Sequence, residues 1–189
     1  MKTLLSMGVC VLSLLTGYAA DMPPMVALEG NGAWKVVAAN YSAASGKNGA
    51  LGSISFNGKE YISDSPKIPG GSYLCQDAVP VLENLTKTKE NVITGTCALG
   101  RISYEFFNDK IVCTVEAAKD KKPVYYIIIN PAAKPGKVSD TEIRLQNGAD
   151  FIKITSDANL WGPWNEHMVW DLKIPGGEKK TVTIEPVKG

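Results

Sequence analysis

The sequence predicts an all-β protein, folded as a two-layer antiparallel β-sandwich. Short apolar-alternating runs, broken by Gly, Asn, Asp and Pro, follow one another along the chain, which is typical of strands joined by turns. No window has the apolar periodicity of a long amphipathic helix. Residues 124–129 read Val-Tyr-Tyr-Ile-Ile-Ile, which is apolar without alternation. Such a strand must be covered on both faces, and this favours two packed sheets over one open sheet.

The predicted strands follow one another closely from residue 26 to residue 185. They lie near residues 26–29, 34–41, 50–56, 59–63, 72–76, 92–98, 101–107, 110–117, 123–129, 141–146, 151–156, 167–174 and 180–185. The nearest approach to a helix is residues 79–86, where Pro80 allows a single helical turn at most.

The N-terminus has the features of a secretory signal peptide. Lys2 precedes an apolar stretch at residues 4–15 that is short for a membrane span, and small residues follow it. We expect residues 1–20 to be removed and the protein to be secreted or periplasmic, with an uncleaved anchor as the alternative. Residues 21–189 then form a single β-sandwich domain, because they suffice for one core and show no linker. No later segment is apolar enough to span a membrane.

The expected mature chain is electrically balanced. Removing residues 1–20 takes one lysine from the 20 basic residues and none of the 19 acidic residues, which leaves 19 of each. A nucleic acid or an anionic membrane selects a basic patch, so neither is expected as a partner.

Two hairpins have a register that their turn residues define. An Asn-Gly type I′ turn at residues 57–58 sets Ile54 opposite Tyr61. An Asn-Asp turn at residues 108–109 aligns six residues on one face, as a half-buried antiparallel pair requires. The pairs that this second turn aligns are Phe106 with Ile111, Tyr104 with Cys113 and Ile102 with Val115.

The expected mature chain has three cysteines, Cys75, Cys97 and Cys113, in a compartment that permits disulfides. A turn at residues 99–100 sets Cys97 opposite Ile102, two strands away from Cys113. Two strand spacings are about 9.6 Å, which exceeds the roughly 7 Å that a disulfide tolerates between Cα atoms. We therefore expect Cys75 to bond either Cys97 or Cys113, with the remaining cysteine buried. The alternative is that all three are reduced core residues.

Catalytic and metal-binding patterns are sparse. His167 is the one histidine, and the cysteines lack a close Cys-x-x-Cys pair, so no metal site and no cofactor are expected. The chain has neither a Gly-x-Ser-x-Gly elbow nor a phosphate-binding loop. A hydrolase that uses two carboxylates stays open, because 19 acidic residues offer many pairs and none stands out.

The densest chemistry lies in residues 159–171, which hold three of the four tryptophans. In residues 167–174, strand alternation turns successive side chains to a core face and a solvent face. The expected core face holds Met168, Trp170, Leu172 and Ile174, and the expected solvent face holds His167, Val169, Asp171 and Lys173. On that solvent face, His167 is expected to be a surface residue rather than a general base.

Trp161 and Trp164 flank a Gly-Pro pair, so we expect both rings to lie on a loop. Exposed rings beside Asn165, Glu166 and His167 have the composition of a sugar-binding platform, in which rings stack on the sugar and polar groups bind its hydroxyls. The alternative is that both rings fold back and close the open end of the sandwich.

Two segments resemble the galactose-mutarotase-like β-supersandwich domains. Residues 49–62, Gly-Ala-Leu-Gly-Ser-Ile-Ser-Phe-Asn-Gly-Lys-Glu-Tyr-Ile, are similar to their early hairpin, and residues 170–184, with Ile-Pro-Gly-Gly-Glu before a final strand, to their last strands. The resemblance implies an association with carbohydrate, as an epimerase or as a module of polysaccharide lyases and glycoside hydrolases. Those epimerases use histidines plus a carboxylate, so the single histidine here favours binding over turnover, and no catalytic residue is assigned.

These observations together predict a secreted, non-catalytic β-sandwich domain that binds a glycan or polysaccharide. The first alternative is a sugar-active enzyme with Glu166 or His167 as acid or base. The second is a structural or partner-binding envelope protein that uses the edges of its sheets.

Overall fold

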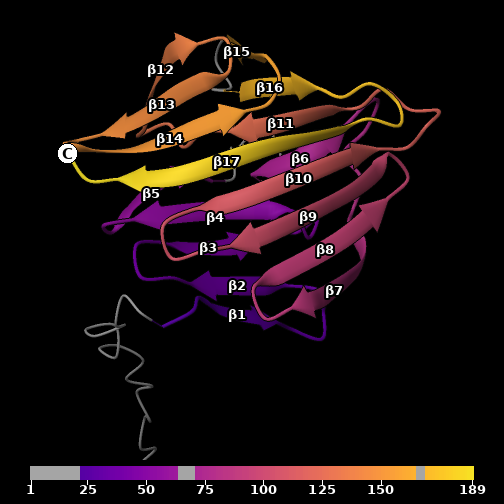
Figure 1. The fold of residues 1–189 in the computed structure, drawn as a ribbon, viewed down its shortest axis with the longest axis horizontal. Coiled ribbons are helices and arrows are strands. Elements are labelled where there is room, and N and C mark those ends of the chain that lie inside the picture. The colour runs from indigo at the N-terminus through magenta and orange to yellow at the C-terminus, as the bar shows by residue number, and fades with distance from the viewer. Residues whose placement is uncertain (1–21, 64–70, 165–168) are drawn as a thin grey trace, which may run out of the picture.

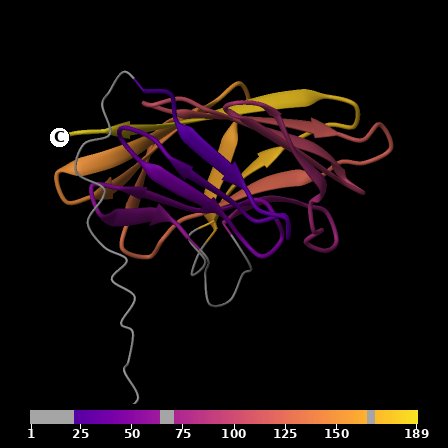
Figure 2. The same ribbon diagram turned by 90° about the horizontal axis from the view of Figure 1, so that it is seen from below.

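The structure, a computed structural model, describes residues 22–63, 71–164 and 169–189. These residues form seventeen strands in two antiparallel sheets that pack face to face (Figure 1), so the predicted β-sandwich is confirmed. Figure 2 shows the two layers from a direction at right angles to the first view. No helix that could cross a membrane is found in the described part of the chain.

Sheet A has nine strands, in the order β1-β2-β3-β4-β6-β11-β16-β15, with β5 paired to β4. It begins with β1 (Met25–Leu28), β2 (Trp34–Val37), β3 (Ser42–Ser45), β4 (Leu51–Phe56) and β5 (Lys59–Ile62). It continues with β6 (Ser72–Cys75), β11 (Val124–Ile128), β16 (Val169–Lys173) and β15 (Leu160–Trp164). The face of this sheet that is turned away from the core is called its outer face below.

Sheet B has eight strands, in the order β12-β13-β14-β17-β10-β9-β8-β7. Its strands are β12 (Lys134–Ser139), β13 (Glu142–Asn147), β14 (Asp150–Ser156), β17 (Lys179–Val187), β10 (Ile111–Ala117), β9 (Gly100–Phe106), β8 (Val92–Cys97) and β7 (Glu83–Lys89). In Figure 1 its strands β17, β10, β9 and β8 run across the view in front of β4, β3 and β2.

The core lies between the sheets and is built from alternate residues of their strands. Trp34 of sheet A packs against Tyr104 and Phe106 of sheet B, with ring centroids 5.3 and 5.4 Å apart. The polar tips of these rings are satisfied, because Trp34 Nε1 donates to the Gly49 carbonyl and Tyr104 accepts from the Leu51 amide. The interface therefore buries large aromatic rings without leaving these polar atoms unpaired.

The turn at residues 57–58 has the expected shape, but the hairpin register differs from the prediction. Asn57 and Gly58 both have positive φ, 49° and 71°, as a type I′ turn requires. A bulge then shifts the register, so that Ile54 lies opposite Ile62 instead of Tyr61. The bulge allows two successive residues, Tyr61 and Ile62, to be fully buried, which a regular strand with alternating sides does not provide.

The β9–β10 hairpin has the predicted register. Its cross-strand pairs include Phe106 with Ile111, Tyr104 with Cys113 and Ile102 with Val115. All six side chains are buried, which confirms that this face of the hairpin is the core face.

The preceding β8–β9 turn lies one residue earlier than predicted, since Cys97 pairs with Gly100 instead of with Ile102. Gly100 belongs to the strand, where a Cβ atom would lie 2.0 Å from the Glu116 carbonyl oxygen of β10. The glycine is therefore required by the close approach of β10, and its presence does not mark the turn.

The three cysteines are free, so the predicted disulfide from Cys75 is wrong. On β6, Leu74 faces the core beside Tyr125, and strand alternation turns Cys75 to the outer face of sheet A. Cys97 and Cys113 belong to sheet B, and Cys113 lies in the core with its Sγ 3.3 Å from the Tyr125 hydroxyl. The cysteines thus lie on different sheets and different faces, which the sequence could not show.

Four strands were not predicted, β3, β7, β12 and β15. The β7 strand begins inside residues 79–86, where a helical turn was the most that was expected. Both β7 and β12 are edge strands with mostly exposed side chains, so they lack the apolar alternation that identifies a strand. The β3 strand is only four residues long, and β15 contains a Gly-Pro pair.

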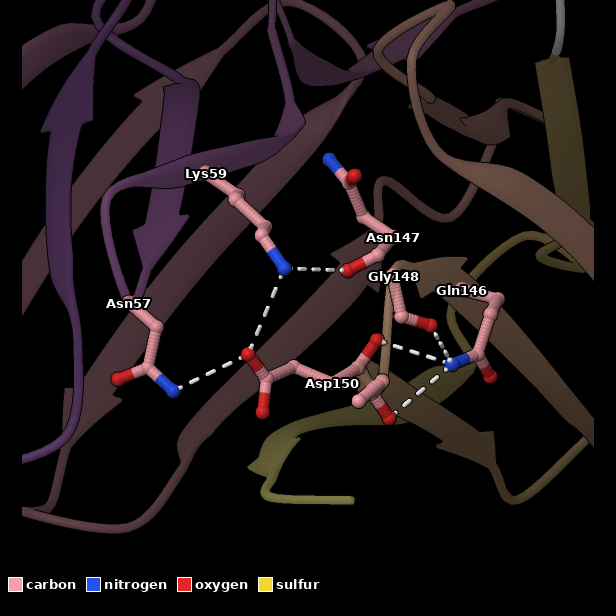
Figure 3. Close-up of polar contacts among 7 residues, drawn as sticks. Asn57, Lys59, Gln146, Asn147, Gly148 and Asp150 are labelled. Atoms are coloured by element: carbon pink, nitrogen blue, oxygen red, sulfur yellow. Dashed lines mark hydrogen bonds and ion pairs between the residues drawn. The ribbon is translucent and has the colours of Figure 1, made fainter.

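A polar cluster joins the two sheets at one end of the sandwich (Figure 3). From the β4–β5 hairpin, Asn57 Nδ2 donates to Asp150 Oδ2 at 3.2 Å and Lys59 Nζ donates to the Asn147 carbonyl at 2.9 Å. Lys59 Nζ also lies 3.7 Å from Asp150 Oδ2. The hydrogen bond from Asn57, together with the Gly189 amide and Lys59, lowers the pKa of Asp150.

The first prediction concerns Trp170, whose side chain is 1% exposed in the core. Replacing it in Trp170→Ala removes a large buried ring and should lower the free energy of unfolding by about 3 to 5 kcal/mol. Val138→Ala, on the edge strand β12, is the control and should change it by less than about 0.5 kcal/mol. Urea unfolding measures both, and a loss below about 1 kcal/mol for Trp170→Ala would contradict the core assignment.

The second prediction concerns the thiols. Burial raises the pKa of Cys113 to about 12, so this group stays protonated and unreactive at neutral pH. Iodoacetamide should label the partly exposed Cys75 and Cys97 in the folded protein, and Cys113 only after unfolding. Peptide mapping by mass spectrometry locates the labels. Labelling of native Cys113, or a disulfide-linked peptide containing Cys75, would show the placement of the thiols to be wrong.

Candidate functional site

The outer face of sheet A carries a row of side chains that crosses four adjacent strands. Cross-strand pairing aligns Tyr73 of β6 with Tyr126 of β11, Tyr126 with Asp171 of β16, and Asp171 with Trp161 of β15. These four residues are called the aromatic row below. Their neighbours Trp170 and Leu172 point the other way and are buried in the core, as predicted. Packing of the inner face therefore holds the row on the outer face.

Trp161 and Trp164 lie on strand β15, so the prediction of a loop is wrong. Their side chains are 49% and 52% exposed, and they do not fold back into the end of the sandwich. The register shifts between them, because two residues lie opposite Trp170 at that point. This bulge adds one residue to the alternation and returns the ring of Trp164 to the outer face.

Gly162 makes the bulge possible. Its φ is +142°, and a Cβ atom built on it would lie 2.7 Å from the Val169 carbonyl oxygen and 3.1 Å from Trp170 Cα. Any larger residue would push β15 away from β16. The Gly-Pro pair that suggested a loop is thus the device that places two tryptophans on one side of an edge strand.

Asp171 lies beneath the tryptophans and is only 6% exposed. The prediction that it faces solvent is therefore wrong, although its strand phase is as predicted. Its Oδ2 accepts a hydrogen bond of 2.7 Å from Trp164 Nε1, while its Oδ1 has no hydrogen-bond partner among the described residues. Burial raises the pKa of Asp171, and the Trp164 hydrogen bond and the charge of Lys173 oppose that rise.

The other members of the site are neutral rings and one cation. Tyr73 and Tyr126 meet edge to face, with ring centroids 5.8 Å apart. Burial raises the pKa of both phenols, that of Tyr73 to about 12, so they stay neutral at ordinary pH. Lys173 Nζ lies 5.7 Å from the Trp161 ring centroid and approaches it as a cation–π contact.

Of the predicted site residues, Trp161 and Trp164 are the two that the structure places. Asn165, Glu166 and His167 lie outside the described residues, and their participation stays a prediction. Sequence reasoning missed Tyr73 and Tyr126, because they come from strands that are distant in the sequence. In the described part of the chain, no group of three or more His, Cys, Asp or Glu side chains could hold a metal ion.

Comparisons with known proteins bear on the fold. No protein family and no curated protein matches this chain. A mutant of heparan sulfate lyase HepC from Pedobacter heparinus is 12% identical, over 80% of this chain and 36% of that chain, with a TM-score of 0.57. The heparinase III BT4657 gene product is 12% identical, over 81% of this chain and 35% of that chain, with a TM-score of 0.52. The protein HI1317 is 11% identical, over 88% of this chain and 100% of that chain, with a TM-score of 0.50.

These likenesses show a shared fold. The β-sandwich of this chain occurs as about a third of the length of the heparan sulfate lyase and of the heparinase III gene product, at 36% and 35%. It also occurs as the whole of HI1317. One architecture therefore serves both as part of a larger enzyme and as a complete chain, and the function must be argued from the side chains of the site.

The third prediction follows from the raised pKa of Asp171. A carboxyl whose folded pKa exceeds its unfolded value binds protons more strongly in the folded state, so its burial costs stability as pH rises through the folded pKa. The wild-type protein should lose stability relative to Asp171→Asn as the pH is raised from about 4 towards neutral. Urea unfolding of both proteins across this range measures the difference in their free energies of unfolding. The contributions of the other carboxyl groups are the same in both proteins and cancel in this difference.

Asparagine has nearly the same shape as aspartate, and its side-chain oxygen can still accept the hydrogen bond from Trp164. A stability difference between the two proteins that stays constant over this pH range would mean that Asp171 has an ordinary pKa. A difference of the opposite sign would mean that the carboxylate is stabilised by partners other than Trp164.

Proposed function

We propose that this protein is a non-catalytic glycan-binding β-sandwich domain, and that the exposed end of the aromatic row, Trp161 together with Trp164, is its binding surface. The observation that carries the proposal is a pair of half-exposed tryptophans on one side of an edge strand, held over the buried Asp171. The apolar faces of a sugar ring stack on indole rings, and its hydroxyl groups donate to a carboxylate.

Binding without turnover fits the composition of the site better than catalysis. Glycoside hydrolysis ordinarily requires two carboxyl groups about 5 to 9 Å apart across the scissile bond. The aromatic row contributes one carboxyl group, Asp171, and that group is already bonded to Trp164. The occurrence of this fold within a heparan sulfate lyase and a heparinase III supports a role towards carbohydrate, as does the resemblance to β-supersandwich domains.

A sugar-active enzyme is the second candidate, and the raised pKa of Asp171 favours it. A carboxyl group whose pKa is raised by burial is better suited to act as a general acid than an ordinary one. A screen of soluble glycans and polysaccharides that follows both binding and product formation separates the two functions. We also propose that the protein works outside the cytoplasm after loss of residues 1–20, because these residues have the pattern of a signal peptide.

The fourth prediction tests the surface with Trp161→Ala. This side chain is 49% exposed, so its removal should leave the melting temperature nearly unchanged. It should weaken glycan binding by roughly 1 to 3 kcal/mol, the scale of a lost aromatic hot spot. Isothermal titration calorimetry on the glycans that bind the wild-type protein measures the loss. Undiminished affinity in Trp161→Ala would remove the row from the binding surface.

Trp164→Ala should behave differently, because this side chain also donates to the buried Asp171. Its removal leaves both carboxylate oxygens without a hydrogen-bond partner among the described residues and should lower stability as well as affinity. Trp164→Ala combined with Asp171→Asn is the matched control, since it removes the buried charge. The double variant should recover stability without recovering affinity.

A further inference from the structure

A depression lies on the face of sheet B that is turned away from the core, on the other side of the sandwich from the tryptophans. Three neighbouring strands form it, β9, β10 and β17, which lie side by side at the front of Figure 1. Its volume is about 170 Å³, and its lining is Arg101, Ser103, Thr114, Glu116 and Lys179. Pockets for drug-sized ligands have about 300 to 1,000 Å³, so this depression suits one chemical group of a larger ligand.

Cross-strand pairing places two cations around the depression. Arg101 of β9 lies opposite Glu116 of β10, which lies opposite Lys179 of β17. Their neighbours Ile102 and Val115 are buried in the core, so strand alternation turns Arg101 and Glu116 outward. Two strand spacings, about 9.6 Å, separate the backbones of the two cationic residues. A group held between them is within reach of both long side chains.

These two cations are not committed to other partners. In the described part of the chain, neither the Arg101 guanidinium nor the Lys179 ammonium group forms an ion pair or donates a hydrogen bond. The neighbouring Lys180, by contrast, is paired with Glu178 at 2.7 Å. One carboxylate, that of Glu116, therefore accompanies two unpaired cations, and the depression has an excess of positive charge. Guanidinium and ammonium groups are the side chains that bind sulfate and carboxylate groups.

Two hydroxyl groups add to the donors of the depression. Ser103 and Thr114 pair with each other across β9 and β10, two residues along the strands from Arg101 and Glu116. Ser103 Oγ accepts from Thr94 Oγ1 at 3.3 Å, which leaves its own hydrogen atom to donate. The Thr114 hydroxyl has no hydrogen-bond partner among the described residues. The lining can thus offer both N–H and O–H donors to the oxygen atoms of one anionic group.

A third cation lies near the start of β17, because two loops pack closely at this end of the sandwich. The Gly177 amide donates to the Ala117 carbonyl at 3.2 Å, and a Cβ atom on Gly176 would clash with the Lys119 carbonyl oxygen. A Cβ atom on Gly177 would lie 3.5 Å from Lys119 Cγ, so the Lys119 side chain passes this glycine. Lys119 is exposed and adds to the positive charge on the loop side of Lys179.

We propose that this depression is a second binding site, which takes a sulfate or carboxylate group of an acidic polysaccharide. The inference rests on the proposed glycan-binding function for the carbohydrate, and on Arg101, Lys179 and the two hydroxyl groups for the charge. A polysaccharide fits better than a nucleic acid, because none of the five lining residues is an aromatic residue on which a base could stack. The site belongs to sheet B, so its occupation does not require the tryptophans of sheet A.

The test compares dextran, dextran sulfate and carboxymethyl dextran of matched length by calorimetry. The three polymers share one backbone, so a difference in affinity reports the acidic group. Both charged dextrans should bind more tightly than neutral dextran, and the tighter of the two identifies the preferred group. Their affinity should fall between about 0.05 and about 0.5 M salt, because salt screens the attraction between exposed charges.

Variants locate the binding of the charged dextrans. Arg101→Gln should weaken it about tenfold, the scale of one lost charge-assisted hydrogen bond. Glu116→Gln should strengthen it severalfold, because the like charge leaves the depression. Arg144→Gln, the same change at the other arginine, on β13 of the same sheet, is the control and should leave the affinity nearly unchanged. All three side chains are exposed, so the melting temperatures should stay close to that of the wild-type protein.

The outcomes separate this inference from the proposed function. Equal affinity for neutral and charged dextran, or unchanged affinity in Arg101→Gln, overturns the anion site. Weaker binding in Glu116→Gln also overturns it. Tighter binding of a DNA duplex than of either charged dextran overturns the ligand class. None of these results touches the glycan-binding function, which the glycan screen and Trp161→Ala test separately on the other sheet.

Discussion

The candidate site depends on the packing of one strand, β16, between a core and an outer face. Trp170 and Leu172 are almost completely buried between the sheets, and this burial permits only one phase of the strand. Asp171, between them in sequence, must then lie on the outer face. A slip of one residue would bring a carboxylate into the apolar core, at a cost far greater than any single contact of the site. The packing of Trp170 and Leu172 in the core thus determines the position of Asp171.

The edge of sheet A adapts this framework to present two large rings. A regular strand would turn Trp161 and Trp164 to opposite faces, because they are three residues apart. The bulge at Gly162 corrects that phase, and the hydrogen bond from Trp164 to Asp171 ties the edge strand to its neighbour. An exposed edge is also prone to pair with other chains, and bulges and prolines reduce this tendency. The same local irregularity therefore protects the edge and builds the surface.

The relation to the lyases illustrates how a fold and its surface chemistry can diverge. The β-sandwich is shared at an identity of 12%, so the likeness shows the fold and leaves the function to the side chains of this chain.

The sequence by itself determined the fold class, most strands, the β9–β10 register and the core position of Trp170, because period-2 alternation and turn residues are local signals. The sequence did not predict edge strands such as β7 or the bulges at Tyr61 and Gly162, because these features depend on how neighbouring strands approach one another. Only the tertiary structure decided that the cysteines lie apart and that distant strands align the aromatic row. These features arise from cross-strand pairing and sheet packing, in which residues far apart in the chain become neighbours.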